Sequence, residues 1–192
     1  MDSEDRFKGM FRVSSARLRT WDYSWPWWYY VTIVVGDRRC VFGTVRRGHV
    51  EPSALGQAAV SFWREIPLHH RHVELDEHIV MPNHVHGIIV LHHRDEEDKP
   101  DRRDVQLNVS TVNPFFSNIS PPSGSLSVVI RTFKAAVTTW ARENGFRTFK
   151  WQERFHDHII RGENDLRRIR EYITLNPVRW SLDAENPDTA SQ

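Results

Sequence analysis

The sequence predicts an α+β fold of the ferredoxin-like class: an antiparallel sheet of order βαββαβ with helices on one face, followed by a C-terminal helix. Two observations support this prediction. Segments rich in aromatic and β-branched residues alternate with segments whose apolar residues recur every three or four positions. These segments follow one another as strand, helix, strand, strand, helix, strand and final helix, which is the order of that fold.

The length of 192 residues suits one domain with a substantial core, which we place at residues 25–182. Residues 1–24 are polar and mixed in charge, and we expect an irregular N-terminal arm there. Residues 92–124 are densely charged and then rich in Pro, Ser and Asn, which predicts a mobile insertion, with a partner-binding segment as the alternative. Residues 183–192 are expected to form a tail.

The overall charge and the cysteine content limit the classes of function. A formal net charge of +1 gives no global field for nucleic acid, so any DNA contact must come from local basic patches. Cys40 is the single cysteine, which excludes an internal disulfide and suits a reducing compartment. Because no apolar run reaches membrane-spanning length and the N-terminus is acidic, we expect a cytoplasmic protein without a membrane partner.

The first half of the chain contains clear strand and helix signals. Residues 25–35 are aromatic and β-branched, which predicts a buried strand, and residues 40–50 predict a short hairpin. Ser53 is expected to cap a helix with one apolar face. We expect this helix to stop near Ile66-Pro67, because proline disrupts a helix interior.

Two central strands, roughly 72–80 and 84–91, are joined by a tight turn and place a histidine pair at the start of the second strand. Residues two apart on a strand point to one face, so His84 and His86 project together and could both reach one metal ion. On pattern alone, a polar strand edge is the more frequent explanation of such a pair, and a metal site is the alternative.

The second half of the chain predicts a helix over 125–144, a strand-like stretch over 149–160 and a last helix from 163 to Asn176, where Pro177 stops it. Tyr172 and Asn176 are four residues apart and therefore lie on one side of this helix, at the border of its apolar stripe. The residues alone favour a core aromatic at Tyr172 and a helix-end residue at Asn176.

Four segments carry a resemblance to a known family. The motif Met81-Pro-Asn-His-Val-His-Gly87 resembles the histidine–hydrophobe–histidine (HUH) motif of single-tyrosine transposases, especially the REP-associated tyrosine transposases. Residues 125–138, 151–161 and 172–178 resemble the helix and the closing segments of that family, in the family's order. The resemblance covers most of residues 28–180 and implies the same ferredoxin-like core.

The resemblance also implies an activity and its residues. Tyr172 matches the nucleophile, and His84, His86 and Asn176 match the ligands of a divalent metal, Mg²⁺ or Mn²⁺. The implied reaction is nicking and rejoining of single-stranded DNA at hairpin-forming sequences through a 5′-phosphotyrosine intermediate, in a monomer or a homodimer. Zinc also suits two imidazoles, so the motif leaves the ion open.

Further side chains are expected to support this chemistry. We interpret His158 as a residue that supports the metal ligands from behind and His156 as a surface residue. A basic zone in the second half would contact the DNA phosphates. Its expected members are Arg131, Lys134, Lys150, Arg154, Arg161, Arg167, Arg168 and Arg170.

Two other functions are compatible with these features. One is an RRM-like nucleic-acid-binding module without catalysis, which the fold order and the many aromatics allow but which leaves His84 and His86 unexplained. The other is an HUH nuclease of the replication or conjugation type. If Tyr172 is not the nucleophile, Tyr29 and Tyr30 are the next candidates.

Overall fold

The computed structural model describes residues 21–93, 122–183 and 185–187. The expected arm up to residue 20, the expected insertion from 94 to 121 and the last five residues of the tail lie outside this range. Trp21 and Tyr23, which were expected in the arm, pack against the hydrophobic core.

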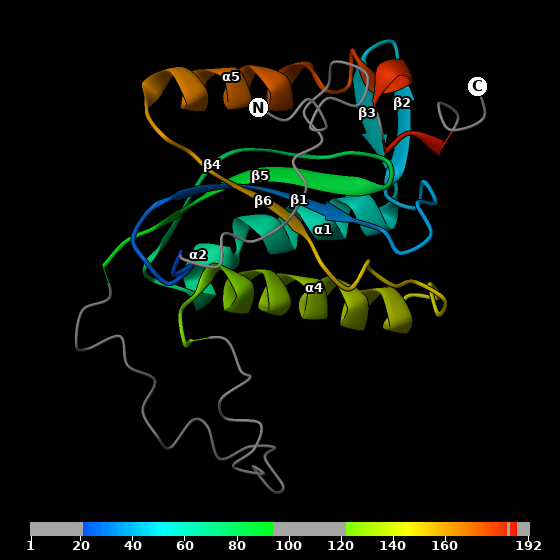
Figure 1. Ribbon diagram of the computed structural model, residues 1–192. Helices are drawn as coiled ribbons and strands as arrows, with labels where there is room; N and C mark the ends of the chain where they lie inside the picture. The colour runs from blue at the N-terminus through cyan, green and yellow to red at the C-terminus, as the bar shows by residue number, and fades with distance from the viewer. Residues whose placement is uncertain (1–20, 94–121, 184, 188–192) are drawn as a thin grey trace, which may run out of the picture.

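The centre of the fold is a four-stranded sheet of order β4-β5-β1-β6, with every neighbouring pair antiparallel. Its strands are β1 (Trp28–Val34), β4 (Val73–Val80), β5 (His84–Leu91) and β6 (His156–Ile159). The first and last strands of the motif therefore lie side by side, and the two central strands extend the sheet beyond β1. This order confirms the ferredoxin-like prediction (Figure 1).

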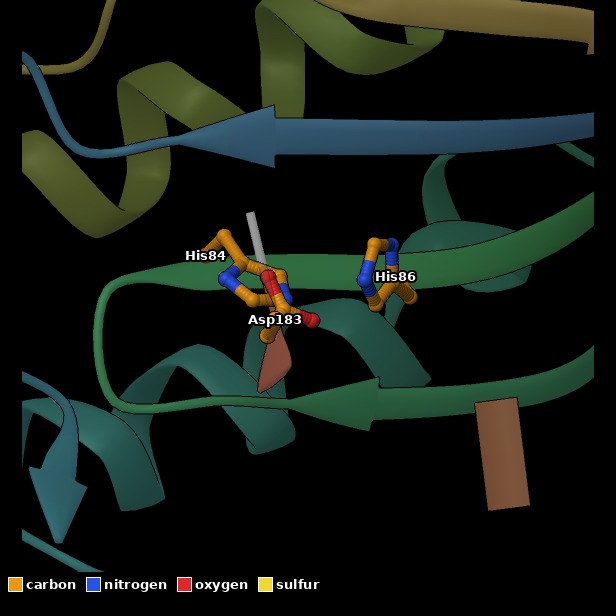
Figure 2. Close-up of side chains that lie close together, drawn as sticks. All are labelled: His84, His86 and Asp183. Carbon is orange, nitrogen blue, oxygen red and sulfur yellow. The ribbon is translucent and has the colours of Figure 1, made fainter. Parts of the chain in front are cut away.

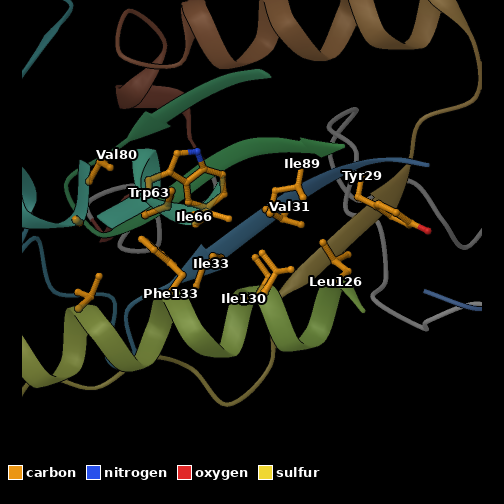
Figure 3. Packing of buried hydrophobic residues seen from close by; sticks show 14 of the residues in the cluster. Tyr29, Val31, Ile33, Trp63, Ile66, Val80, Ile89, Leu126, Ile130 and Phe133 are labelled. Atoms are coloured by element: carbon orange, nitrogen blue, oxygen red, sulfur yellow. The ribbon is translucent and has the colours of Figure 1, made fainter. Parts of the chain in front are cut away.

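The side chains of β1 alternate between the two faces of the sheet, and each face packs against a separate hydrophobic cluster. Tyr29, Val31 and Ile33 are fully buried on the face covered by α1 (Ala54–Arg64) and α4 (Leu126–Glu143). Figure 3 shows these side chains beside residues of α4. Trp28 and Tyr30 point to the other face and pack with the cluster beneath α5 (Glu163–Leu175). Figure 1 shows α5 on one side of the sheet and α1 and α4 on the other.

The N-terminus of α1 forms as the sequence predicts. The Ser53 hydroxyl accepts a hydrogen bond from the Gly56 amide at 3.1 Å and donates one to the Val41 carbonyl at 2.7 Å. The helix ends at Arg64, close to the predicted stop, and a short helix that was not predicted, α2 (Ile66–His69), follows. Pro67 lies in the first turn of α2, where its missing amide hydrogen costs nothing.

The stretch 149–160 was predicted as one strand, and only its end is one. Strand β6 covers His156–Ile159, and a single bridge joins Val35 to Trp151. The intervening chain is held by α4 instead, because the Trp151 indole donates to the Lys134 carbonyl at 3.1 Å and the Lys134 ammonium donates to the Gln152 carbonyl at 2.6 Å.

Two further elements border α5. Strands β2 (Gly43–Arg46) and β3 (His49–Pro52) form the predicted hairpin, which is separate from the main sheet. A short 3-10 helix, η3 (Trp180–Leu182), follows α5. No helix among the described residues is long and apolar enough to span a lipid bilayer.

Gly87 fixes how closely α1 approaches β5. A β-carbon at this position would lie 2.2 Å from Cζ2 of Trp63, whose ring is fully buried between the sheet and α4. We therefore expect Gly87→Ala to destabilise the protein by about 1–3 kcal/mol through overpacking. Thermal unfolding would measure this loss, and Trp63→Phe in the same chain should recover part of it by removing the clashing ring atoms. A Gly87→Ala protein as stable as the wild type would contradict this packing.

Candidate metal and tyrosine site

The site lies on the α5 face of the sheet, where His84 and His86 begin β5. Both side chains are buried, with exposed fractions of 0% and 3%, and their ring centroids are 4.3 Å apart. They point to the same face, as the strand period predicts. Burial lowers the pKa of His84 to about 3, and burial together with His84 lowers the pKa of His86. Both imidazoles are therefore neutral at physiological pH and can offer a lone pair.

The neighbouring Asn83 determines which nitrogen of His84 offers that lone pair. Its amide nitrogen donates to the backbone carbonyls of Arg38 at 2.9 Å and Glu185 at 2.6 Å, and a carbonyl can only accept. The Asn83 side-chain oxygen therefore faces His84 Nδ1 at 2.9 Å, and this nitrogen must carry the hydrogen. Nε2 is left with its lone pair, and no donor among the described residues reaches it.

His86 is held by two hydroxyl groups from β1. Its Nδ1 lies 2.7 Å from the Tyr30 hydroxyl and 2.9 Å from the Thr32 hydroxyl, and its ring stacks against the Tyr30 ring. Either hydroxyl can accept a hydrogen from Nδ1, which frees Nε2 as a ligand. Nε2 of His86 is also buried without a hydrogen bond in the described part of the chain.

Asp183 completes a cluster of three possible metal ligands, although it was expected to belong to the C-terminal tail. Ligand atoms of His84, His86 and Asp183 all lie within 4.8 Å of one another, and all three residues are buried (Figure 2). The chain after α5 turns through η3 and brings the carboxylate back to β5. The Glu185 amide fixes this carboxylate by donating to Oδ1 at 2.7 Å.

Asn176, the cap of α5, lies beside Asp183. Its amide nitrogen donates to Asp183 Oδ2 at 2.9 Å. Its Oδ1 is buried and receives no hydrogen bond from the described residues. The oxygen that the family resemblance assigns to the metal is thus available, next to a carboxylate that the sequence motifs did not indicate.

Tyr172 lies one helical turn before Asn176 and borders the histidines. Its ring centroid is 5.3 Å from that of His86 and 6.3 Å from that of Tyr30, in edge-on contacts. The side chain remains 40% exposed, so a large substrate can reach it. Burial raises the pKa of the Tyr172 hydroxyl, and the negative charge of Asp183 raises it further. The phenol is therefore protonated at neutral pH.

These donors fit a divalent cation. Two neutral imidazole nitrogens, a carboxylate and an amide oxygen are all ordinary ligands of divalent metals. Unpaired acceptors in a buried position cost about 1–3 kcal/mol each, and a bound cation would remove that cost. The cluster could therefore hold a metal, and this ligand set does not select one ion.

The second histidine pair lies apart from this cluster. His156 is exposed, as predicted. His158 Nε2 lies 2.8 Å from Asp165 Oδ2, in the first turn of α5. His158 thus contacts the start of the tyrosine-bearing helix, and within the described part of the chain no hydrogen bond joins it to His84 or His86.

The basic residues expected to contact DNA are divided between the two faces. Arg131 and Lys134 lie on α4, which covers the face opposite the histidines, and the Lys134 ammonium is bound to backbone carbonyls. Arg170 is also engaged, because its Nε donates to Asp76 at 2.8 Å and ties α5 to β4. The remaining expected residues are exposed; they are Lys150, Arg154, Arg161, Arg167 and Arg168.

Comparison with known proteins identifies relatives by sequence and by structure. No family model matches the chain. An uncharacterized protein of Haemophilus influenzae is 33% identical over 175 residues, which are 91% of this chain and 93% of the relative. The solved structure of a REP-associated tyrosine transposase bound to a REP hairpin superposes with a TM-score of 0.52 at 18% identity, covering 82% of this chain and 70% of that one. The predicted resemblance is thereby confirmed for the fold.

Proposed function

Because the chain belongs to one family with the Haemophilus influenzae protein and has the fold of a REP-associated tyrosine transposase, we propose that it is a metal-dependent transposase. In this proposal it nicks and rejoins single-stranded DNA, with Tyr172 as the nucleophile. The observation that carries the proposal is local. Three buried lone pairs without hydrogen bonds among the described residues, on His84 Nε2, His86 Nε2 and Asn176 Oδ1, belong to the site that Tyr172 borders.

His84, His86 and an oxygen from Asn176, Asp183 or both would hold the cation. Mg²⁺ and Mn²⁺ suit the oxygen ligands, and Mn²⁺ also suits the imidazoles. When bound, such a cation would neutralise charge on the scissile phosphate and lower the energy of the tyrosinate. The chain itself supplies the preorganisation, since Asn83 fixes the tautomer of His84 and the β1 hydroxyls orient His86.

The proposed chemical step transfers the phosphoryl group from the 3′ oxygen of the DNA to the protein. The Tyr172 oxygen attacks the scissile phosphorus, and the bond from phosphorus to the 3′ oxygen breaks. The phenol loses one proton and the departing 3′ oxygen gains one, so the products are a 5′-phosphotyrosine and a free 3′-hydroxyl. Attack by another 3′-hydroxyl reverses the step and regenerates the phenol. Neither direction consumes water or a nucleotide cofactor.

The proposed substrate is hairpin-forming single-stranded DNA, by analogy with the structural relative, which is bound to a REP hairpin. The exposed Arg161, Arg167 and Arg168 lie on or next to α5, on the face of the sheet that carries the site. Guanidinium groups there can pair with phosphates. We leave Arg131 and Lys134 out of this interface because α4 covers the opposite face.

The test is covalent capture. The protein is incubated with hairpin oligonucleotides that carry randomised single-stranded flanks and a label at either the 5′ or the 3′ end, with Mn²⁺ or with EDTA, and is run on a denaturing gel. We expect a slower protein band that carries the 3′ label, because the 5′-phosphate side of the cut stays on the protein, and we expect EDTA to remove it. Retention of DNA on native gels without any adduct in Mn²⁺ would favour the RRM-like binding module.

A further inference from the structure

The tip of the β2–β3 hairpin has an uncommon backbone for its sequence. Arg46 pairs with His49, so Arg47 and Gly48 form a two-residue turn, with φ angles of 51° and 77°. Such a turn requires a left-handed conformation at both positions and favours Asn, Asp or Gly in them. Among the described residues, Arg38 and Arg47 are the two non-glycine residues with positive φ, a conformation that is sterically unfavourable for arginine.

The conformation of Arg38 has an explanation within the site. Its carbonyl accepts from Asn83, which orients His84, and its guanidinium Nε lies 3.3 Å from a Glu185 carboxylate oxygen. Arg47 has no such contact. It is exposed, and its guanidinium makes no hydrogen bond or ion pair with the part of the chain that the structure describes. The turn sets the φ of Arg47, but no contact among the described residues explains an arginine at this position, which points to a role outside the fold.

The hairpin tip is fixed next to the tyrosine. A β-carbon on Gly48 would lie 3.2 Å from Cγ2 of Val178, so the turn packs against the chain that follows α5. Val178 is six residues after Tyr172 and three residues beyond the end of α5 at Leu175. Figure 1 shows the hairpin beside the end of α5. A DNA strand several nucleotides long that is bound at Tyr172 could therefore reach the hairpin tip.

The charge of this region favours phosphate. Arg179 directly follows Val178, is exposed, and forms no ion pair with the described residues. Arg46 is also exposed, but its Nε is 3.3 Å from Glu51. Arg47 and Arg179, which form no ion pair with any described residue, thus flank the packed contact between the hairpin tip and Val178. Guanidinium binds phosphate in a bidentate geometry.

We propose that Arg47, with Arg179 beside it, grips the phosphate backbone of the DNA strand next to the nucleophile. This inference rests on the proposed function and adds an element that the sequence did not indicate. The turn would anchor the Arg47 backbone beside the chain that follows α5, so that its guanidinium can reach a phosphate of the strand that Tyr172 attacks.

The test uses binding rather than cleavage. All variants carry Tyr172→Phe, so no covalent complex forms, and the probe is a fluorescein-labelled hairpin oligonucleotide with single-stranded flanks. Arg47→Gly and Arg47→Asn remove the charge and also relieve the backbone strain, so the melting temperature should stay equal or rise. Arg47→Lys keeps the charge but loses the bidentate geometry. Arg131→Ala removes the same charge from α4, on the opposite face, and is the control.

Fluorescence anisotropy over a series of salt concentrations gives the affinity and its salt dependence. We expect Arg47→Gly and Arg47→Asn to weaken binding by roughly five- to tenfold and to reduce the slope of log affinity against log salt by about 0.7–0.9, the value for one phosphate contact. Arg47→Lys should keep the slope, and Arg131→Ala should change neither quantity.

Two results would overturn the inference. Binding by Arg47→Gly with the affinity and slope of its parent would show that Arg47 touches no phosphate. Equal losses in Arg47→Gly and Arg131→Ala would show a general charge effect instead of a local contact. If either of these results is obtained while the wild-type protein forms the covalent adduct, the proposed function stands without this inference. If it neither binds nor captures DNA, both fall.

Discussion

Tyr172→Phe is expected to keep the fold and to lose covalent DNA capture completely. The change removes one hydroxyl from a ring that is 40% exposed and packs edge-on against His86 and Tyr30, so the free energy of unfolding should change by no more than about 1 kcal/mol. The phosphoryl group then has no oxygen to accept it. Binding of uncut DNA should persist, because phosphate contacts come from other side chains.

Two other tyrosines supply controls for this experiment. Tyr29 is buried on the α4 face, where its hydroxyl donates to the Trp25 carbonyl, so Tyr29→Phe should leave the adduct unchanged. Tyr30→Phe removes one of the two hydroxyls near His86 Nδ1 and should slow capture without abolishing it, since Thr32 remains. An adduct that survives Tyr172→Phe and disappears with Tyr30→Phe would assign the nucleophile to β1.

His84→Ala and His86→Ala are each expected to abolish divalent-metal binding. Each replacement removes one of the two lone pairs at the centre of the cluster, and the remaining ligands are too few to hold Mg²⁺ or Mn²⁺ tightly. A cation that binds the folded state raises the melting temperature. We therefore expect added Mn²⁺ to raise the melting temperature of the wild type and to leave that of either variant unchanged.

Matched histidine and carboxylate variants sharpen this prediction. His156→Ala and His158→Ala remove histidines outside the cluster and should keep the Mn²⁺ shift. Asp183→Asn keeps the shape of the side chain and should reduce the shift if the carboxylate is a ligand. A shift that is lost in His156→Ala and kept in His84→Ala would place the metal at His156 and His158 instead, and would contradict this prediction.

Much of the site could be predicted from the sequence because its parts follow local periods. Alternation in β5 places His84 and His86 on one face, and the helical period of α5 places Tyr172 and Asn176 on one side. The structure adds that these two faces meet, because α5 packs on the side of the sheet opposite α1 and α4.

The remaining parts depend on contacts that no local period encodes. Asp183 reaches the histidines through the turn of η3 after Pro177, and its sequence context resembles an ordinary polar tail. Asn83 could have been noticed beside His84, but its role rests on the distant carbonyls of Arg38 and Glu185. Likewise, the spacing of Arg131 and Lys134 along α4 does not indicate that this helix covers the face of the sheet opposite the histidines.

The most direct test of Tyr172 as the nucleophile is to locate the DNA-linked residue by mass spectrometry of a trypsin digest of the captured complex. Cleavage after Arg170 and Arg179 releases residues 171–179, Glu-Tyr-Ile-Thr-Leu-Asn-Pro-Val-Arg, in which Tyr172 is the single tyrosine. Tyr29 and Tyr30 fall in a different peptide, residues 20–38. After nuclease trimming, we expect a nucleotide 5′-phosphate on the 171–179 peptide, formed with Mn²⁺ and not with EDTA. The same mass on the 20–38 peptide, or on a peptide without tyrosine, would contradict this expectation.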